Sequence, residues 1–298
     1  MKLKSDLKRF HDYMAIERGL SPRTALEYCR DVDRFQRAHE MRIPDLKPAK
    51  LTKKMRAWIN GLMADGSNKP QSVHRKIAAL HAYCKWLVRE GALKKNPVDE
   101  IERPKCEKRL PKCMSTAQVG SILDARVERR TPAMELRDHA ILEVMYGSGL
   151  RRAEVCYLSI RDVDFEAKML HVVGKGNKER AVFLGDPAAD AIRAYLATRP
   201  GAQPADALFL TQRGGRLKVR GLWSIFKQYR EAAGVENVTP HTMRHSYATH
   251  MLENGADIVT LKELLGHSSI ATTQTYTNVS IPHMRGTFER THPRAKVS

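Results

Sequence analysis

The sequence has few cysteines, no long apolar segment and little negative charge. No apolar run approaches the roughly 18 residues that a membrane-spanning helix needs. The N-terminus, Met1-Lys2-Leu3-Lys4, lacks the apolar core of a signal peptide. These absences predict a soluble protein of the cytoplasm.

The cysteines are odd in number and form no C-x-x-C pair, which argues against a disulfide framework and against a thiolate zinc site. We expect buried, reduced thiols at all five positions: Cys29, Cys84, Cys106, Cys113 and Cys156.

Acidic residues are scarce relative to basic ones. The chain has 33 Asp and Glu against 52 Lys and Arg, a formal net charge of +19. Residues 1–110 alone have 26 basic and 14 acidic residues, a net charge of +12. Lys and Arg gain affinity for polyanions by releasing counterions from phosphates, so the excess indicates a polyanionic partner. Charge alone is equally compatible with a well-solvated surface.

The length of 298 residues predicts two domains, at about 100–200 residues each. Periodic apolar positions predict four helices in the N-terminal part. Three of them cover about 3–18, 52–63 and 71–89, and the remaining one begins at Ser21-Pro22. Three prolines among basic residues then interrupt the pattern. The predicted domains are therefore 1–103 and 115–298, joined by a linker at 104–114.

The second domain is predicted to be mainly helical. It begins at a capping box, Ser115-Thr116-Ala117-Gln118. Residues 162–184 alternate around the turn Gly174-Lys175-Gly176-Asn177, which predicts a β-hairpin or a small antiparallel sheet. Helices are expected at about 187–198, 220–233, 239–254 and 257–265, with short ones after Ser269 and Pro282. The fold class is thus mainly α with one small antiparallel sheet.

The segment Thr239-Pro240-His241-Thr242-Met243-Arg244 has the strongest local chemistry. Thr239 and Pro240 begin a helix, whose unpaired N–H groups favour an anion. His241 and Arg244 lie three residues apart and share one helix face. The alternative is a basic helix start on a solvated surface. His241 and His245 have the spacing of a zinc pair, but the H-E-x-x-H glutamate is missing, so no metal is expected.

Three further clusters stand elsewhere in the sequence. Gly147-Ser148-Gly149 makes a tight turn before Arg151, and Glu154 either orients that arginine or forms an ordinary surface pair. Lys175 lies at a hairpin turn, where it can reach a leaving group or be merely solvated. Leu264-Leu265-Gly266-His267 ends a helix at His267, and Tyr276 follows in a polar stretch.

Taken together, Arg151, Lys175 in G-K-G-N-K-E-R, His241-x-x-Arg244, His267 and Tyr276 resemble the pattern of the tyrosine recombinase (phage integrase) family. The resemblance covers nearly the whole chain and is closest to the Xer site-specific recombinases. It implies that the N-terminal helices form a SAM-like core-binding domain and that 115–298 form the catalytic domain.

The resemblance also implies a chemistry. Tyr276 would attack a DNA phosphodiester to form a 3′-phosphotyrosyl link, with Arg151 and Arg244 binding the non-bridging oxygens. His241 and His267 would add donors or move the nucleophile's proton, and Lys175 would protonate the leaving 5′-oxygen. No cofactor, metal or ATP is required.

The same resemblance implies the partners. Four protomers would assemble on two double-stranded DNA sites and pass through a Holliday junction, with a paralogous recombinase and a DNA translocase as candidate partners. The task would be resolution of chromosome or plasmid dimers; the alternative is integration of a phage or other mobile element. A non-catalytic DNA-binding protein and a zinc hydrolase are the competing classes. The segment from about Ile281 to Pro293 would pack on its own domain or dock on a neighbouring protomer.

Overall fold

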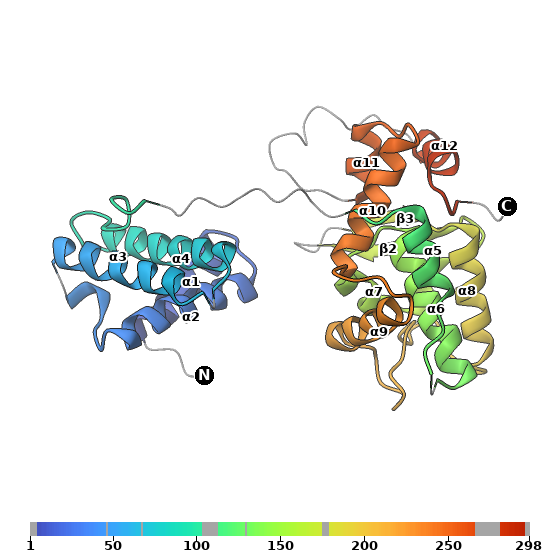
Figure 1. Cartoon of the computed structure of the whole chain (residues 1–298), viewed down its shortest axis with the longest axis horizontal. Coiled ribbons are helices and arrows are strands. Elements are labelled where there is room, and N and C mark those ends of the chain that lie inside the picture. The colour runs from blue at the N-terminus through green and yellow to red at the C-terminus, as the bar shows by residue number, and fades with distance from the viewer. Residues whose placement is uncertain are drawn as a thin grey trace. The chain divides into compact units, whose positions relative to one another are not determined.

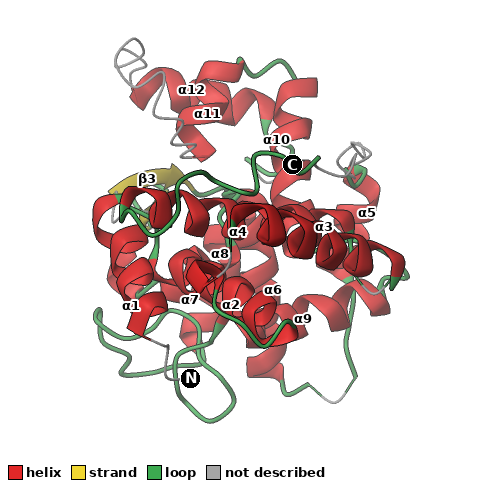
Figure 2. Ribbon diagram, turned by 90° about the vertical axis from the view of Figure 1, so that its left-hand side faces the viewer, coloured by secondary structure: helices red, strands yellow, loops and turns green. Residues whose placement is uncertain are grey.

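The computed structural model describes residues 5–45, 47–66, 68–102, 113–128, 130–174, 179–265 and 281–295. The chain divides into two compact units, Met1–Arg109 and Leu110–Ser298. Twelve α-helices are found in the described part, and they are labelled in chain order in Figure 1. Figure 2 shows how little of the chain is strand. No helix among the described residues is long and apolar enough to cross a membrane.

Four helices form the first unit: α1 Ser5–Asp12, α2 Pro22–Ala38, α3 Pro48–Ala64 and α4 Pro70–Arg89. Proline occupies the first turn of three of them, where its missing N–H costs no hydrogen bond. The Ser21 side chain accepts a bond from the Thr24 N–H at 3.2 Å, as predicted for the start of α2. The helix expected over 3–18 is present, but its second half is not α-helical: the α-helix ends at Asp12 and continues as a π-helix, Tyr13–Glu17.

The core of the first unit is built from the inner faces of these helices. Phe10, Phe35 and Tyr83 are fully buried, and Phe10 packs edge-on against Tyr83 with ring centroids 5.0 Å apart. Val98 and Ile101 are buried in the same core, so the chain remains part of this unit to residue 102.

The second unit surrounds α6, Pro132–Gly147, whose residues Ala140 to Gly147 are all buried. Ser115 and Gln118 form the predicted capping box at the start of α5. The other helices of this unit are α5 Thr116–Asp124, α7 Arg152–Tyr157, α8 Asp186–Ala197, α9 Val219–Ala232, α10 Pro240–Glu253, α11 Ile258–Leu265 and α12 Ile281–Thr291.

The sheet of the second unit has three antiparallel strands in the order β1-β2-β3. They are β1 Val163–Asp164, β2 Met169–Val173 and β3 Glu179–Phe183. Val172 pairs with Arg180 across the hairpin formed by β2 and β3. Side chains at paired positions share a face of the sheet, and Val172 lies on the buried face.

Three of the cysteines follow the expectation. Cys29, Cys84 and Cys156 are buried and free. Burial raises the pKa of the Cys156 thiol to about 11. The expectation is wrong for Cys113, which is exposed because it lies where the chain enters the second unit. Cys106 lies outside the described residues.

The C-terminal segment 281–295 packs on its own unit, which is one of the two arrangements considered above. The Asn254 side chain donates to the Thr291 carbonyl at 2.7 Å, and Arg285 donates to the Ala167 carbonyl at 2.6 Å. Beyond α12, the Arg294 Nε donates to the buried carboxylate of Glu143 at 3.0 Å. His292 is buried between the rings of Tyr146, Tyr247 and Phe288.

We expect the stability of the protein to depend on pH because the His292 imidazole is buried. Burial lowers its pKa to about 3 from an ordinary value of 6.5, so the folded protein keeps this imidazole neutral. Between these values the unfolded chain binds the extra proton, and the free energy of unfolding falls as the pH falls, by up to about 1.4 kcal/mol per pH unit. Urea unfolding at about pH 7.5 and about pH 5.5 should show the unaltered protein losing roughly 1 kcal/mol more than His292→Phe. Equal losses in the two proteins would contradict this account.

Candidate active site

Arg151 is fixed at the start of α7 by a buried carboxylate. It occupies the N-cap position, where its backbone N–H donates to Glu154 Oε2 at 2.8 Å. Its Nη1 donates to Glu154 Oε1 at 2.9 Å. The Glu154 side chain is only 5% exposed, against 38% for Arg151. Of the two interpretations left open for Glu154, the structure therefore shows the one in which it orients the arginine.

Arg180 holds the same carboxylate from the other side. From the first half of β3, its Nη1 and Nη2 donate to Oε1 and Oε2 of Glu154, each at 3.0 Å. Burial by itself would raise the pKa of Glu154. The hydrogen bonds from Arg180 and Arg151 outweigh burial and leave that pKa below its ordinary value. Arg180 is the last residue of the segment G-K-G-N-K-E-R quoted above, but no local pattern marks it as the partner of a residue 26 positions away.

Arg244 reaches this cluster from α10. The helix begins as predicted, with Thr239 and Thr242 forming a capping box and Pro240 in the first turn. Arg244 is 6% exposed, and it donates to the Gly149 and Leu265 carbonyls at 2.6 Å each. Leu265 ends α11, directly before Gly266-His267 in the sequence. Arg244 therefore joins the turn before α7 to the end of α11.

The three arginines form one electrostatic unit. Burial and the positive charges of Arg151 and Arg180 together lower the pKa of Arg244 to about 10, while Glu154 opposes this shift. Three guanidinium groups and one carboxylate leave a net charge of +2. A phosphate oxyanion bound beside them would relieve this repulsion, and guanidinium groups match its geometry with paired hydrogen bonds.

The other predicted site residues divide into two groups. His241 is exposed in the first turn of α10, on the same helix as Arg244. Lys175, His267 and Tyr276 lie outside the described residues. The described part of the chain contains no cluster of three or more His, Cys, Asp or Glu residues placed to hold a metal ion.

Ser246 and His250 hold α10 in place, and neither is among the site residues predicted from the sequence. Ser246 Oγ accepts from the Met114 N–H at 2.8 Å, and His250 Nε2 donates to the Met114 carbonyl at 2.7 Å. The Tyr146 hydroxyl bonds to His250 Nδ1 at 2.9 Å. The point where the chain enters the second unit is therefore bound to the helix that carries His241 and Arg244. No local pattern predicts these contacts.

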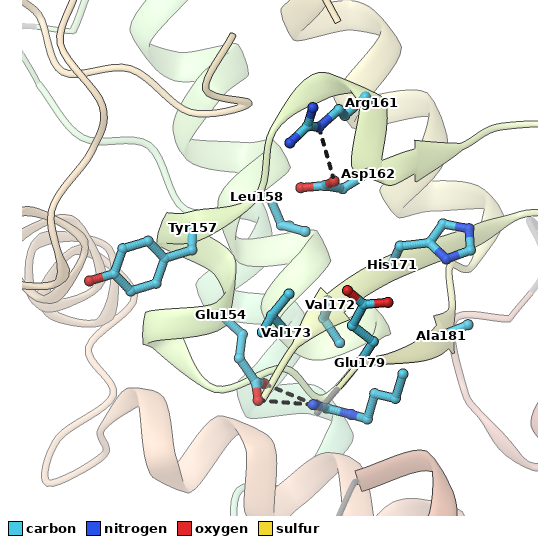
Figure 3. A pocket seen from close by; sticks show the side chains of 11 residues that line it. Glu154, Tyr157, Leu158, Arg161, Asp162, His171, Val172, Val173, Glu179 and Ala181 are labelled. Carbon is cyan, nitrogen blue, oxygen red and sulfur yellow. Dashed lines mark hydrogen bonds and ion pairs between the residues drawn. The ribbon is translucent and has the colours of Figure 1, made fainter. Parts of the chain in front are cut away.

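A pocket of about 560 Å³ lies beside the cluster, between α7 and the β2–β3 hairpin. Figure 3 shows Glu154 at one end of it, with Arg161 and Asp162 across the pocket. Tyr157 lies at its rim with 72% of its surface exposed. The Glu154–Arg180 pair therefore lines this pocket.

We expect position 149 to tolerate no side chain larger than that of glycine. Its φ is +59°, and a Cβ there would lie 2.6 Å from the Tyr247 ring. Gly149→Ala should lower the free energy of unfolding by about 3 kcal/mol and displace the carbonyl that accepts from Arg244. The matched control is Gly234→Ala, with φ +66° and nothing within 4 Å, which should cost about 1 kcal/mol. Equal urea midpoints for the two variants would show that the Tyr247 contact is unimportant.

Comparisons with known proteins agree with this architecture. The model of the "Phage integrase family" matches residues 112–283, and that of "Phage integrase, N-terminal SAM-like domain" matches residues 7–91. The tyrosine recombinase XerC of Pelobacter propionicus is 37% identical over 297 residues, covering 99% of this chain and 97% of that protein.

Two solved structures show the same fold. The crystal structure of XerA recombinase aligns with a TM-score of 0.50 and 28% identity, over 98% of this chain and all of that one. A lambda integrase tetramer bound to a Holliday junction aligns with a TM-score of 0.68 and 20% identity, over 90% of this chain and 78% of that one.

Proposed function

The chain belongs to the phage integrase family as a Xer-like tyrosine site-specific recombinase, and on that premise we propose how its own residues cut and rejoin DNA. Tyr276 is the nucleophile, and Arg151 and Arg244 bind the phosphate that it attacks. The observation that carries this assignment is the cluster of three arginines around Glu154. It concentrates positive charge where the turn before α7, the hairpin and the end of α11 meet.

The arginines suit the charge that develops during the reaction. When the Tyr276 oxygen attacks phosphorus, the phosphate passes through a five-coordinate state with increased charge on its non-bridging oxygens. Arg244 is held rigidly by two backbone carbonyls and Arg151 by Glu154, so neither has to reorganise as that charge appears. Preorganised donors of this kind stabilise the transition state more than the bound substrate.

The covalent step balances without an added cofactor. A bond forms between the Tyr276 oxygen and phosphorus, and the bond between phosphorus and the 5′-oxygen breaks. The tyrosine proton passes to a base, for which His241 and His267 are the candidates, and Lys175 protonates the departing 5′-oxygen. The phosphotyrosyl bond retains the energy of the phosphodiester, so the 5′-hydroxyl of a second strand reverses the step without ATP.

Assembly follows from the same proposal. The substrate is double-stranded DNA, and four protomers act on two sites in the cytoplasm. The solved lambda integrase tetramer bound to a Holliday junction supports the number of protomers. The excess positive charge of residues 1–110 provides contacts with the DNA backbone. A paralogous recombinase and a DNA translocase are the proposed further partners, and resolution of chromosome or plasmid dimers is the proposed task.

Covalent capture tests this function. The purified protein is incubated with sheared genomic DNA of the source organism and denatured in detergent, and the DNA that stays attached is sequenced. We expect one short sequence to dominate; a single chromosomal copy favours dimer resolution, and copies flanking a mobile element favour the integrase alternative. Reversible binding without any attached DNA would instead favour a non-catalytic DNA-binding protein.

A further inference from the structure

We infer that Arg180 is a positioning residue for strand cleavage: it neutralises Glu154 so that this carboxylate orients Arg151 without withdrawing it from the scissile phosphate. The inference rests on the proposed function, because it assigns Arg180 a part in the step attributed to Arg151. Arg180 itself makes no contact with the reacting atoms in this account.

The contacts show how one carboxylate is shared between two arginines. Glu154 receives four hydrogen bonds, two from the Arg180 fork and two from Arg151, by its backbone N–H and by Nη1. A carboxylate has about four lone-pair sites, so both of its oxygens are fully used. The two Arg180 bonds make a bidentate pair, the strongest arrangement available between these side chains.

The surroundings of Arg180 explain why it cannot serve as an ordinary surface arginine. It pairs with Val172 on the buried face of the sheet, and its side chain is only 15% exposed. Its Nε is buried and has no hydrogen-bond partner among the described residues. A guanidinium in such a place is stable only because of the Glu154 carboxylate, so the pair forms one unit.

Removing Arg180 changes the charge balance at Arg151. Without the fork, both Glu154 oxygens lose a donor, and Arg151 is the nearest cation bonded to them. A carboxylate that Arg180 no longer neutralises then competes with the phosphate for the Arg151 guanidinium. Cleavage should therefore slow although the DNA is still bound, because a misplacement of about 1 Å near the reacting groups costs up to about a hundredfold in rate.

The test uses a nicked suicide duplex that carries the captured sequence. The rate of cleavage is measured as the formation of the covalent protein–DNA adduct at saturating protein concentration. Arg180→Ala should cleave about ten- to a hundredfold more slowly, with a half-saturating protein concentration within about twofold of the unaltered value. Arg193→Ala is the matched control, an exposed arginine on α8 paired with Asp190 at 2.8 Å, and it should cleave normally. If Arg180→Ala does not fold, Arg180→Lys replaces it, since lysine retains the charge without the fork.

A double-mutant cycle separates this role from two others. In a Glu154→Gln background, Arg180→Ala should slow cleavage by less than about twofold, since the two residues act as one unit. Two results would mean that Arg180 contacts DNA directly and would overturn the inference. One is that the losses of cleavage rate are additive, and the other is that the salt dependence of DNA binding falls by about one phosphate contact. A folded Arg180→Ala that cleaves at the unaltered rate would also overturn it. If the unaltered protein forms no adduct, the proposed function fails, and the inference fails with it.

Discussion

Tyr276→Phe is expected to abolish the covalent protein–DNA complex completely. Phenylalanine has no oxygen to attack phosphorus, and a phosphotyrosyl bond cannot form without one. The measurement is a denaturing gel of the protein with an end-labelled suicide duplex carrying the captured sequence. Affinity for the same duplex in a native gel should remain within about twofold, since a single hydroxyl contributes little beside many phosphate contacts.

The matched control for this substitution is Tyr157→Phe. Tyr157 is the exposed tyrosine at the rim of the pocket beside Glu154 and Arg180, so it lies near the cluster and is accessible to a bound strand. We expect its variant to form the adduct normally. An adduct that survives in Tyr276→Phe and disappears in Tyr157→Phe would transfer the nucleophile to Tyr157.

Arg244→Lys is expected to slow strand cleavage by about 10²–10³-fold, the effect of removing one preorganised donor from a transition state. Lysine keeps the positive charge but has no planar fork, so it cannot hold the Gly149 and Leu265 carbonyls while facing a phosphate. Single-turnover cleavage of the same duplex at saturating protein measures the loss. DNA affinity should change far less than the rate.

The control for Arg244→Lys is a second arginine with similar bonds outside the cluster. Arg199 Nη1 donates to the Ala207 and Leu208 carbonyls at 2.9 and 2.7 Å. Arg199→Lys should lower the thermal unfolding midpoint without slowing cleavage. Equal losses of rate in the two variants would mean that Arg244 acts only through the stability of the fold.

Local signals explain which parts of the fold could be predicted from sequence. Ser21, Ser115 and Thr239 each stand before a helix and cap it as expected, because an N-cap depends on residues within three positions of it. The hairpin was visible for the same reason, from alternation around a glycine-rich turn. The π-helical turn at Tyr13–Glu17 was missed, because a π-helical turn has no simple sequence signature.

The supporting contacts of the candidate site depend on residues far apart in the chain. Arg151 and Glu154 are three residues apart, and their spacing is compatible both with an orienting carboxylate and with an ordinary surface pair. Arg180 meets Glu154 only because the β2–β3 hairpin packs against α7, and His250 meets Met114 across 136 residues. A periodic pattern shows which face of an element is buried, but not which distant partner a buried charge finds there.

The chemical identity of the protein–DNA bond decides whether Tyr276 is the nucleophile. The adduct formed on a suicide duplex is trimmed with nuclease, digested with protease and sequenced by tandem mass spectrometry. We expect a nucleotide joined through its 3′-phosphate to the oxygen of Tyr276, with a free 5′-hydroxyl on the released strand. A linkage to another residue, or through a 5′-phosphate, would contradict this expectation.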